Sequence, residues 1–192
     1  MSKAKYKYSD EILKEILSEV TDQFDSLNIK HYVINSIRFG NLRSSNAECV
    51  QTVDYAGNVK EEIVICKAFA RNESDCTRKD LKDLIMHELI HSVISNDVLT
   101  YNKTDGKAIY RNLPHGERWN EIAKEIEKRF PEYSLFSPKS YDDIVYPQFP
   151  VKYIYSCPRC GSNENIRATE VEDRSFCFFC GNPIKLKKPD II

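Results

Sequence analysis

The chain has 192 residues, of which 41% are hydrophobic and 30% are charged, and its formal net charge is −1. This share of apolar residues is enough for a hydrophobic core, so the composition excludes a chain that is disordered throughout. The balanced charge argues against a strongly basic surface of the kind that binds nucleic acid through phosphate contacts. No run of 18 apolar residues occurs, and no signal-peptide core follows the basic first ten residues. We therefore expect a cytoplasmic protein that does not contact a membrane.

The N-terminal third of the chain predicts a helix followed by a small sheet. Ser9 is the predicted N-cap of a helix in which apolar residues recur at helical spacing up to about Leu27. From His31 to Phe69, β-branched and aromatic residues predict three strands, and His31 itself is expected to be a surface or packing residue. The turn signal Ala56-Gly57-Asn58 predicts that the last two strands form a hairpin. The two strands of this hairpin are Cys49–Tyr55 and Glu61–Phe69.

Two further helices and two irregular segments are predicted beyond the sheet. A mostly buried helix is expected from Asp80 to about Ser95, and residues 96–114 are expected to form a long loop. Helical periodicity returns from Gly116 to Phe130. Residues 131–150 contain four prolines interleaved with aromatic residues, which predicts an extended arm outside regular structure. The aromatic side chains of this arm can pack back on the first domain.

The segment His87-Glu88-Leu89-Ile90-His91 is a His-Glu-x-x-His motif inside the first of these two helices. Residues four apart lie one turn apart on the same side of a helix, so the two histidines can bind one metal ion. Glu88 can then take a proton from a zinc-bound water, whose pKa the metal lowers to about 7. The motif predicts a zinc hydrolase, with peptide bonds as the expected substrate. The alternative is a helix that carries two histidines and binds no metal.

A catalytic zinc site commonly has three protein ligands and an open position, so a third ligand has to come from elsewhere in the chain. We predict His115, which directly precedes the last predicted helix. Asp97 is one alternative, because one class of zinc peptidases has its third ligand six residues after the second histidine. That class needs glycine for a sharp turn where this chain has Ile94. Glu117, in the first turn of the last helix, is the other alternative.

Four of the seven cysteines form two Cys-x-x-Cys pairs, and 16 residues separate the pairs. A glycine follows each pair and permits the turn that directs backbone amides at thiolate sulfurs. This spacing predicts a structural zinc site in a C-terminal zinc ribbon that the metal holds folded. Its four ligands are Cys157, Cys160, Cys177 and Cys180. The other three cysteines, Cys49, Cys66 and Cys76, are expected to be ordinary semi-buried thiols.

With His87-Glu88-Leu89-Ile90-His91 and the downstream segment His115-Gly116-Glu117-Arg118-Trp119, the chain resembles the SprT-like zinc metallopeptidases. Members of that family have a second motif of His-Gly-x-x followed by an aromatic residue, and a helix and small sheet before the first motif. Many also carry a zinc ribbon after the peptidase domain. The resemblance covers most of the chain. It implies that zinc binds His87, His91 and His115, that Glu88 is the catalytic acid and base, and that Trp119 packs behind the site.

The sequence departs from the compact members of the family in one place. The gap between His91 and His115 is longer, which an insertion around Asn102–Leu113 would explain. Such an insertion would be either a lid over the site or a tolerated surface loop.

Together these patterns predict an α+β protein with a small antiparallel or mixed sheet, helices that carry the zinc-peptidase site, and a C-terminal zinc ribbon. The expected domains are a SprT-like metallopeptidase domain at 1–130, a connecting arm at 131–150 and the ribbon at 151–192. The expected function is a zinc-dependent metalloendopeptidase with one catalytic and one structural zinc and a protein or peptide substrate. Because Spartan-type members of the family cleave proteins crosslinked to DNA, DNA or DNA-bound protein is a hypothetical partner.

Two other functions are compatible with the sequence. In one, the protein is a nucleic-acid-binding or regulatory adaptor that uses the ribbon, and the peptidase site is vestigial. In the other, the same zinc ligands serve the hydrolysis of a bond other than a peptide.

Overall fold

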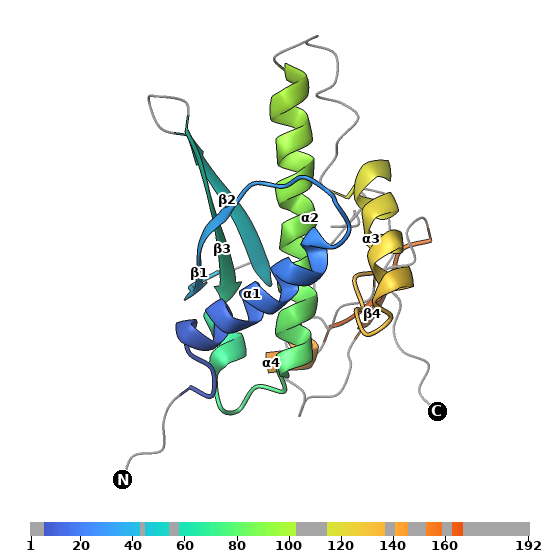
Figure 1. Cartoon of the computed structure of the whole chain (residues 1–192). Helices are drawn as coiled ribbons and strands as arrows, with labels where there is room; N and C mark the ends of the chain where they lie inside the picture. The colour runs from blue at the N-terminus through green and yellow to red at the C-terminus, as the bar shows by residue number, and fades with distance from the viewer. Residues whose placement is uncertain are drawn as a thin grey trace.

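The structure is a computed structural model, which describes residues 6–42, 45–53, 58–102, 115–136, 141–145, 153–158 and 163–166. It has the α+β architecture that the sequence predicts (Figure 1). The elements in chain order are α1 (Asp10–Asp25), β1 (Ile34–Gly40), β2 (Ala47–Val53), β3 (Val59–Cys66), the 3-10 helix η1 (Lys67–Ala70), α2 (Arg78–Asn102), α3 (Glu117–Arg129), α4 (Tyr141–Val145), β4 (Tyr153–Ser156) and β5 (Asn163–Ile166). None of the described helices is long and apolar enough to cross a membrane.

The first three strands form one mixed sheet in the order β1-β3-β2. β2 and β3 pair antiparallel with Cys49 opposite Ile63, so the predicted hairpin is confirmed. β1 pairs parallel with β3, with Ile37 opposite Ile63. β2 is therefore an edge strand of the sheet, and its antiparallel partner β3 is the central strand.

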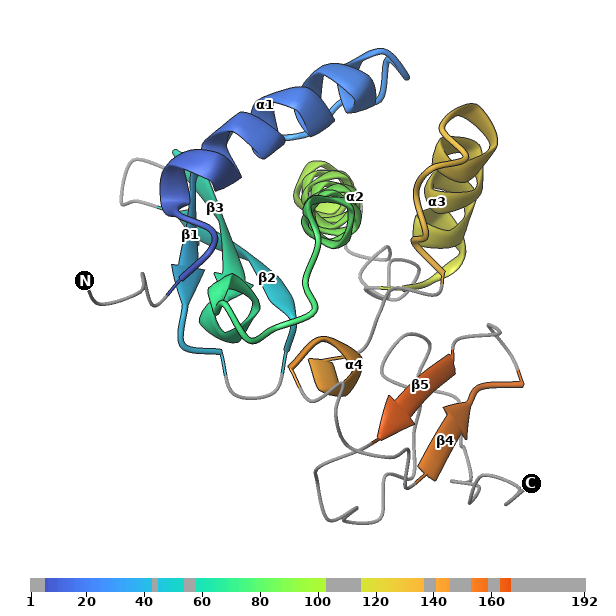
Figure 2. The same cartoon turned by 90° about the horizontal axis from the view of Figure 1, so that it is seen from below.

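Helix α2 lies at the centre of the fold. Viewed along its axis, it has the sheet on one side, α3 on the other, and α1 across the top (Figure 2). Buried residues occupy every face of its middle turns, which is the pattern of a helix surrounded by other elements. Those with at most 6% of their surface exposed include Leu81, Leu84, Ile85, Met86, Leu89, Ile90, Val93 and Ile94. From α1, Leu13, Ile16, Val20 and Phe24 complete the same core, and each such buried side chain stabilises the fold by about 1.5–3 kcal/mol.

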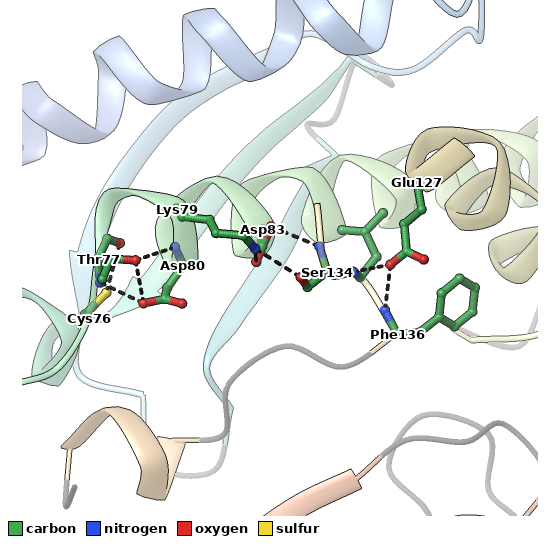
Figure 3. Close-up of polar contacts among 9 residues, drawn as sticks. Cys76, Thr77, Lys79, Asp80, Asp83, Glu127, Ser134 and Phe136 are labelled. Carbon is green, nitrogen blue, oxygen red and sulfur yellow. Dashed lines mark hydrogen bonds and ion pairs between the residues drawn. The ribbon is translucent and has the colours of Figure 1, made fainter. Parts of the chain in front are cut away.

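A capping box at Thr77 and Asp80 fixes the start of α2. The Asp80 carboxylate accepts from the backbone N–H and the hydroxyl of Thr77, both at 2.7 Å, and the Asp80 N–H donates to that hydroxyl at 3.2 Å (Figure 3). These bonds satisfy backbone groups that a helix terminus leaves without partners. The helix consequently starts two residues before the predicted position at Asp80.

The other end of α2 corrects the predicted loop. The helix continues through residues 96–102 and ends at Asn102, whereas the sequence predicted its end near Ser95. Polar residues cost an existing helix less than about 1 kcal/mol each, so a helix already formed can extend through a segment of loop-like composition. The rest of the predicted loop and insertion, residues 103–114, lies outside the described residues.

The segment after α3 packs on the domain, as its aromatic residues suggested. Tyr133 and Leu135 are buried in the same core as the helices. The prediction that the whole arm avoids regular structure is wrong, because residues 141–145 form α4. This short helix fits between Pro138 and Pro147, so neither proline interrupts it.

The described part of the C-terminal region is a two-stranded hairpin. β4 and β5 pair antiparallel, with Ser156 opposite Asn163, so that the first Cys-x-x-Cys pair falls in the connection between them. Cys157 is buried directly after β4. The other three predicted ligands, Cys160, Cys177 and Cys180, lie outside the described residues. The four-cysteine site therefore stays a prediction.

Candidate metal centre

Three histidine side chains converge between α2 and the start of α3. The Nε2 atoms of His87 and His91, one turn apart on α2, are separated by 3.2 Å. The Nε2 atom of His115, which lies two residues before α3, is 3.1 Å from that of His91 and 2.9 Å from that of His87. The three rings thus direct one nitrogen each at a common point. This group is the one the sequence predicted, and it is arranged so that it can hold a metal ion.

Hydrogen bonds among the three rings cannot account for all three close contacts between the Nε2 atoms. The Nε2 atom of a neutral imidazole either carries a hydrogen and donates, or carries a lone pair and accepts. Among three nitrogens in mutual contact at least two are of the same kind, so at least one contact is repulsive. A cation accepts a lone pair from all three nitrogens at once. Tetrahedral zinc, with nitrogen ligands at about 2.0–2.1 Å, separates those ligands by about 3.3–3.4 Å, close to the distances found here.

The surroundings of the histidines favour the neutral form that binds metals. Burial, together with the neighbouring rings of His91 and His115, lowers the pKa of His87 well below its ordinary value. Burial, followed by the effect of His115, lowers the pKa of His91 to about 3. Both rings therefore keep an available lone pair at neutral pH, so that metal binding releases no proton from them.

Glu88 lies on the side of α2 that faces strand β2 and is only 5% exposed. Burial raises the pKa of its carboxyl group to about 8, and the negative charge of Glu48 acts in the same direction. A hydrogen bond from the backbone N–H of Cys49 opposes the shift and ties the carboxylate to the edge strand. A buried carboxyl group with a pKa near neutrality can exchange a proton in either direction, which is what general acid and base chemistry needs.

Trp119 packs against the three imidazoles from α3. Its ring centroid is 4.9 Å from that of His87, 5.0 Å from that of His115 and 6.5 Å from that of His91. The side chain is 2% exposed, so it closes one side of the group to water. Its indole nitrogen is buried without a hydrogen-bond partner among the described residues. The position next to the three rings is the one that the family resemblance implied.

The other candidate ligands, Asp97 and Glu117, and the fourth histidine, His31, are not part of this histidine group. The backbone of Asp97 continues α2 as a helix, so the chain makes no turn there that would return residue 97 to the histidines. Glu117 is exposed at the start of α3 and does not belong to the histidine group. His31 packs edge-on against Phe24, and its Nε2 atom lies 2.9 Å from a carboxylate oxygen of Asp25. It is the packing residue that the sequence predicted.

Sequence reasoning missed two residues around the site, Cys49 and Phe136. The first gives its backbone N–H to Glu88, and the second packs its ring perpendicular to that of Trp119 at 5.7 Å. A backbone donor leaves no signal in residue type, because every residue except proline offers an N–H. The aromatic residues of segment 131–150 were a signal for packing, but spacing alone does not tell which of them reaches the site.

Searches with this chain match no protein-family model, no curated protein and no solved structure. The resemblance to SprT-like peptidases therefore rests on the motifs quoted above.

Proposed function

We propose that this protein is a zinc-dependent metallopeptidase of the SprT-like type. In this proposal His87, His91 and His115 bind the catalytic zinc, and Glu88 is the general acid and base. The observation that carries the proposal is the convergence of three Nε2 atoms, all within 3.2 Å of one another, beside a buried glutamate. The remaining part of the proposal is a structural zinc on Cys157, Cys160, Cys177 and Cys180, which is supported by their spacing.

Zinc at the three histidines would supply a Lewis acid and a bound water with a lowered pKa. The residues of the chain supply the rest of the chemistry. The Glu88 carboxylate, held by the N–H of Cys49, accepts a proton during attack on the substrate carbonyl and returns it to the leaving amine. Trp119 keeps water from the rear of the ligands. Three imidazole ligands that leave a position open, with a carboxylate nearby, are a donor set suited to metal-assisted hydrolysis of an acyl bond.

Casein is a suitable test substrate because it is unfolded and offers many cleavable bonds. The wild type, Glu88→Gln and the matched control Glu125→Gln, an exposed residue on α3, are compared at equal zinc content. We expect loss of the general base to slow turnover by about 10²–10⁴-fold, and the control to be unchanged. Equal turnover by wild type and Glu88→Gln would end the proposal.

The same assay with single-stranded DNA added distinguishes the alternatives for partner and function. Faster cleavage of a DNA-bound protein than of casein would support the expectation of a DNA-associated substrate. Salt-dependent DNA binding without proteolysis would instead favour the adaptor function.

A further inference from the structure

Residues 131–136 cross from the end of α3 to α2, and we call this segment the strap. Three consecutive backbone N–H groups of the strap donate to carboxylates on the two helices. The N–H of Ser134 donates to Asp83 on α2 at 3.2 Å. The next two, those of Leu135 and Phe136, donate to one oxygen of Glu127 on α3 at 2.6 and 3.3 Å (Figure 3). One short piece of backbone thus joins both helices through directional bonds.

Side chains reinforce the attachment at both ends of the strap. On the α2 side, the Lys79 ammonium group donates to Asp83 at 2.6 Å and to the Ser134 hydroxyl at 3.0 Å. Asp83 is only 4% exposed, so one of its carboxylate oxygens, Oδ1, would lose the Ser134 N–H if the strap moved away, and losing a hydrogen bond is costly for a buried oxygen. On the α3 side, Leu135 is 1% exposed and Phe136 packs edge-on against Trp119.

The relative position of the two helices decides whether the metal centre closes. His87 and His91 are on α2, while His115 lies two residues before α3, so sliding one helix along the other would separate the nitrogens. Metal sites tolerate changes of only about 0.2 Å in ligand distance. Interdigitating apolar side chains favour particular arrangements of two packed helices. The hydrogen bonds of the strap add a directional constraint, because each donor faces one particular carboxylate.

We propose that the strap positions α2 and α3 for metal binding, with Asp83 and Glu127 as the positioning residues. This inference rests on the proposed metal centre. The strap would then control how tightly the metal binds, although all three histidines come before the strap in the sequence. Glu127 touches none of the histidines. It would affect metal binding by holding the backbone of the strap, which in turn holds α3 in place against α2.

The chain provides its own reporter for a test. Trp119 is the single tryptophan of the chain, and its ring centroid lies 4.9 Å from that of His87 and 5.0 Å from that of His115. Binding of Co²⁺ at the histidines should therefore quench the tryptophan fluorescence of the full-length protein. The same titration of His91→Ala measures any quenching that comes from the cysteine site and is subtracted.

The decisive comparison is between two glutamates two residues apart on α3. Glu127→Ala removes the acceptor of two strap N–H groups, and we expect Co²⁺ to bind it about tenfold more weakly, the lower end of what loss of an outer hydrogen bond costs a metal site. Glu125→Ala removes an exposed carboxylate of the same helix and should match wild type. Glu127→Gln keeps an acceptor oxygen at the same place, so its affinity should lie between the two.

If the strap only stabilised the fold and did not position the metal site, the results would differ. Leu13→Val removes part of a buried side chain on α1 that takes part in none of the strap's hydrogen bonds, and should lower stability without changing Co²⁺ affinity. If Leu13→Val weakens Co²⁺ binding as much as Glu127→Ala, or if Glu127→Ala and Glu125→Ala bind alike, the strap does not position the site. Should Glu127→Ala fail to fold, Glu127→Gln and Phe136→Leu carry the same comparison. A wild type that shows no more quenching than His91→Ala would instead refute the metal centre itself.

Discussion

The Nε2 atoms of His87 and His115 lie 2.9 Å apart although the two histidines are 28 positions apart in the chain. One belongs to the central helix and the other to the segment that leads into α3, so the contact depends on how those two helices pack. The indole of Trp119 is almost equidistant from both rings and comes from the first turn of α3. The third histidine and the tryptophan behind it thus come from neighbouring positions at the start of α3.

Zinc content distinguishes this arrangement from three histidines that share a cavity by chance. The wild type should purify with about two zinc ions per chain, one for each four-coordinate site. His115→Ala should lower the count to one, because two imidazoles hold zinc far less tightly than three. The matched control is His31→Ala, which removes a histidine bonded to Asp25 and should leave the count unchanged. A wild-type count of one by mass spectrometry would show that one of the two sites does not exist.

The capping box should account for a measurable part of the stability of α2. Thr77→Ala removes the hydroxyl that exchanges hydrogen bonds with Asp80. We expect the free energy of unfolding to fall by about 1 kcal/mol, the usual value of an N-cap. Thr77→Ser keeps the hydroxyl and should lose less than half of that. Urea unfolding followed by tryptophan fluorescence measures both variants, and equal stability of Thr77→Ala and wild type would contradict the role of the cap.

The thiol of Cys49 should be unusually slow to react. Burial raises its pKa well above the ordinary value, and the negative charges of Glu61 and Glu88 raise it further. A raised pKa means less thiolate at any given pH, so alkylation by iodoacetamide should stay slow even at pH 9, where an ordinary thiol reacts fully. Peptide mass spectrometry should find Cys49 unmodified in the folded protein and modified in urea. Glu61→Gln removes one negative charge and should speed the reaction; rapid labelling of the folded wild type would refute this account.

Gly40, the last residue of β1, is expected to tolerate no side chain. A Cβ atom at this position would overlap Cγ1 of Val64 on the neighbouring strand β3. Both strands are part of the sheet, so neither backbone can move freely, and we expect Gly40→Ala to cost about 1–3 kcal/mol. The double variant Gly40→Ala with Val64→Ala removes the obstructing methyl group. Thermal unfolding should therefore show the double variant to be more stable than the sum of the two single changes; simple additivity would exclude the clash.

The elements set by local sequence patterns were predicted well. Ser9 caps α1 as expected, with its side chain accepting from the N–H of Ile12, because capping depends only on nearby residues. The β2–β3 hairpin was predicted for the same reason. The predicted end of α2 was wrong by about two turns, since residues 96–102 have a loop-like composition and yet continue a helix that was already formed. The short helix α4 was missed because prolines on either side hid it.

Two histidines one helical turn apart were fixed by the sequence alone, since helix geometry places residues i and i+4 on the same side. Tertiary structure decided that His115, and not Glu117, lies beside these two histidines, because it brings the start of α3 against α2. The parallel pairing of β1 with β3, the bond from Cys49 to Glu88 and the strap between Asp83 and Glu127 were likewise decided only there. Each of these depends on backbone groups that every residue carries, so residue type gives no sign of them until the chain has folded.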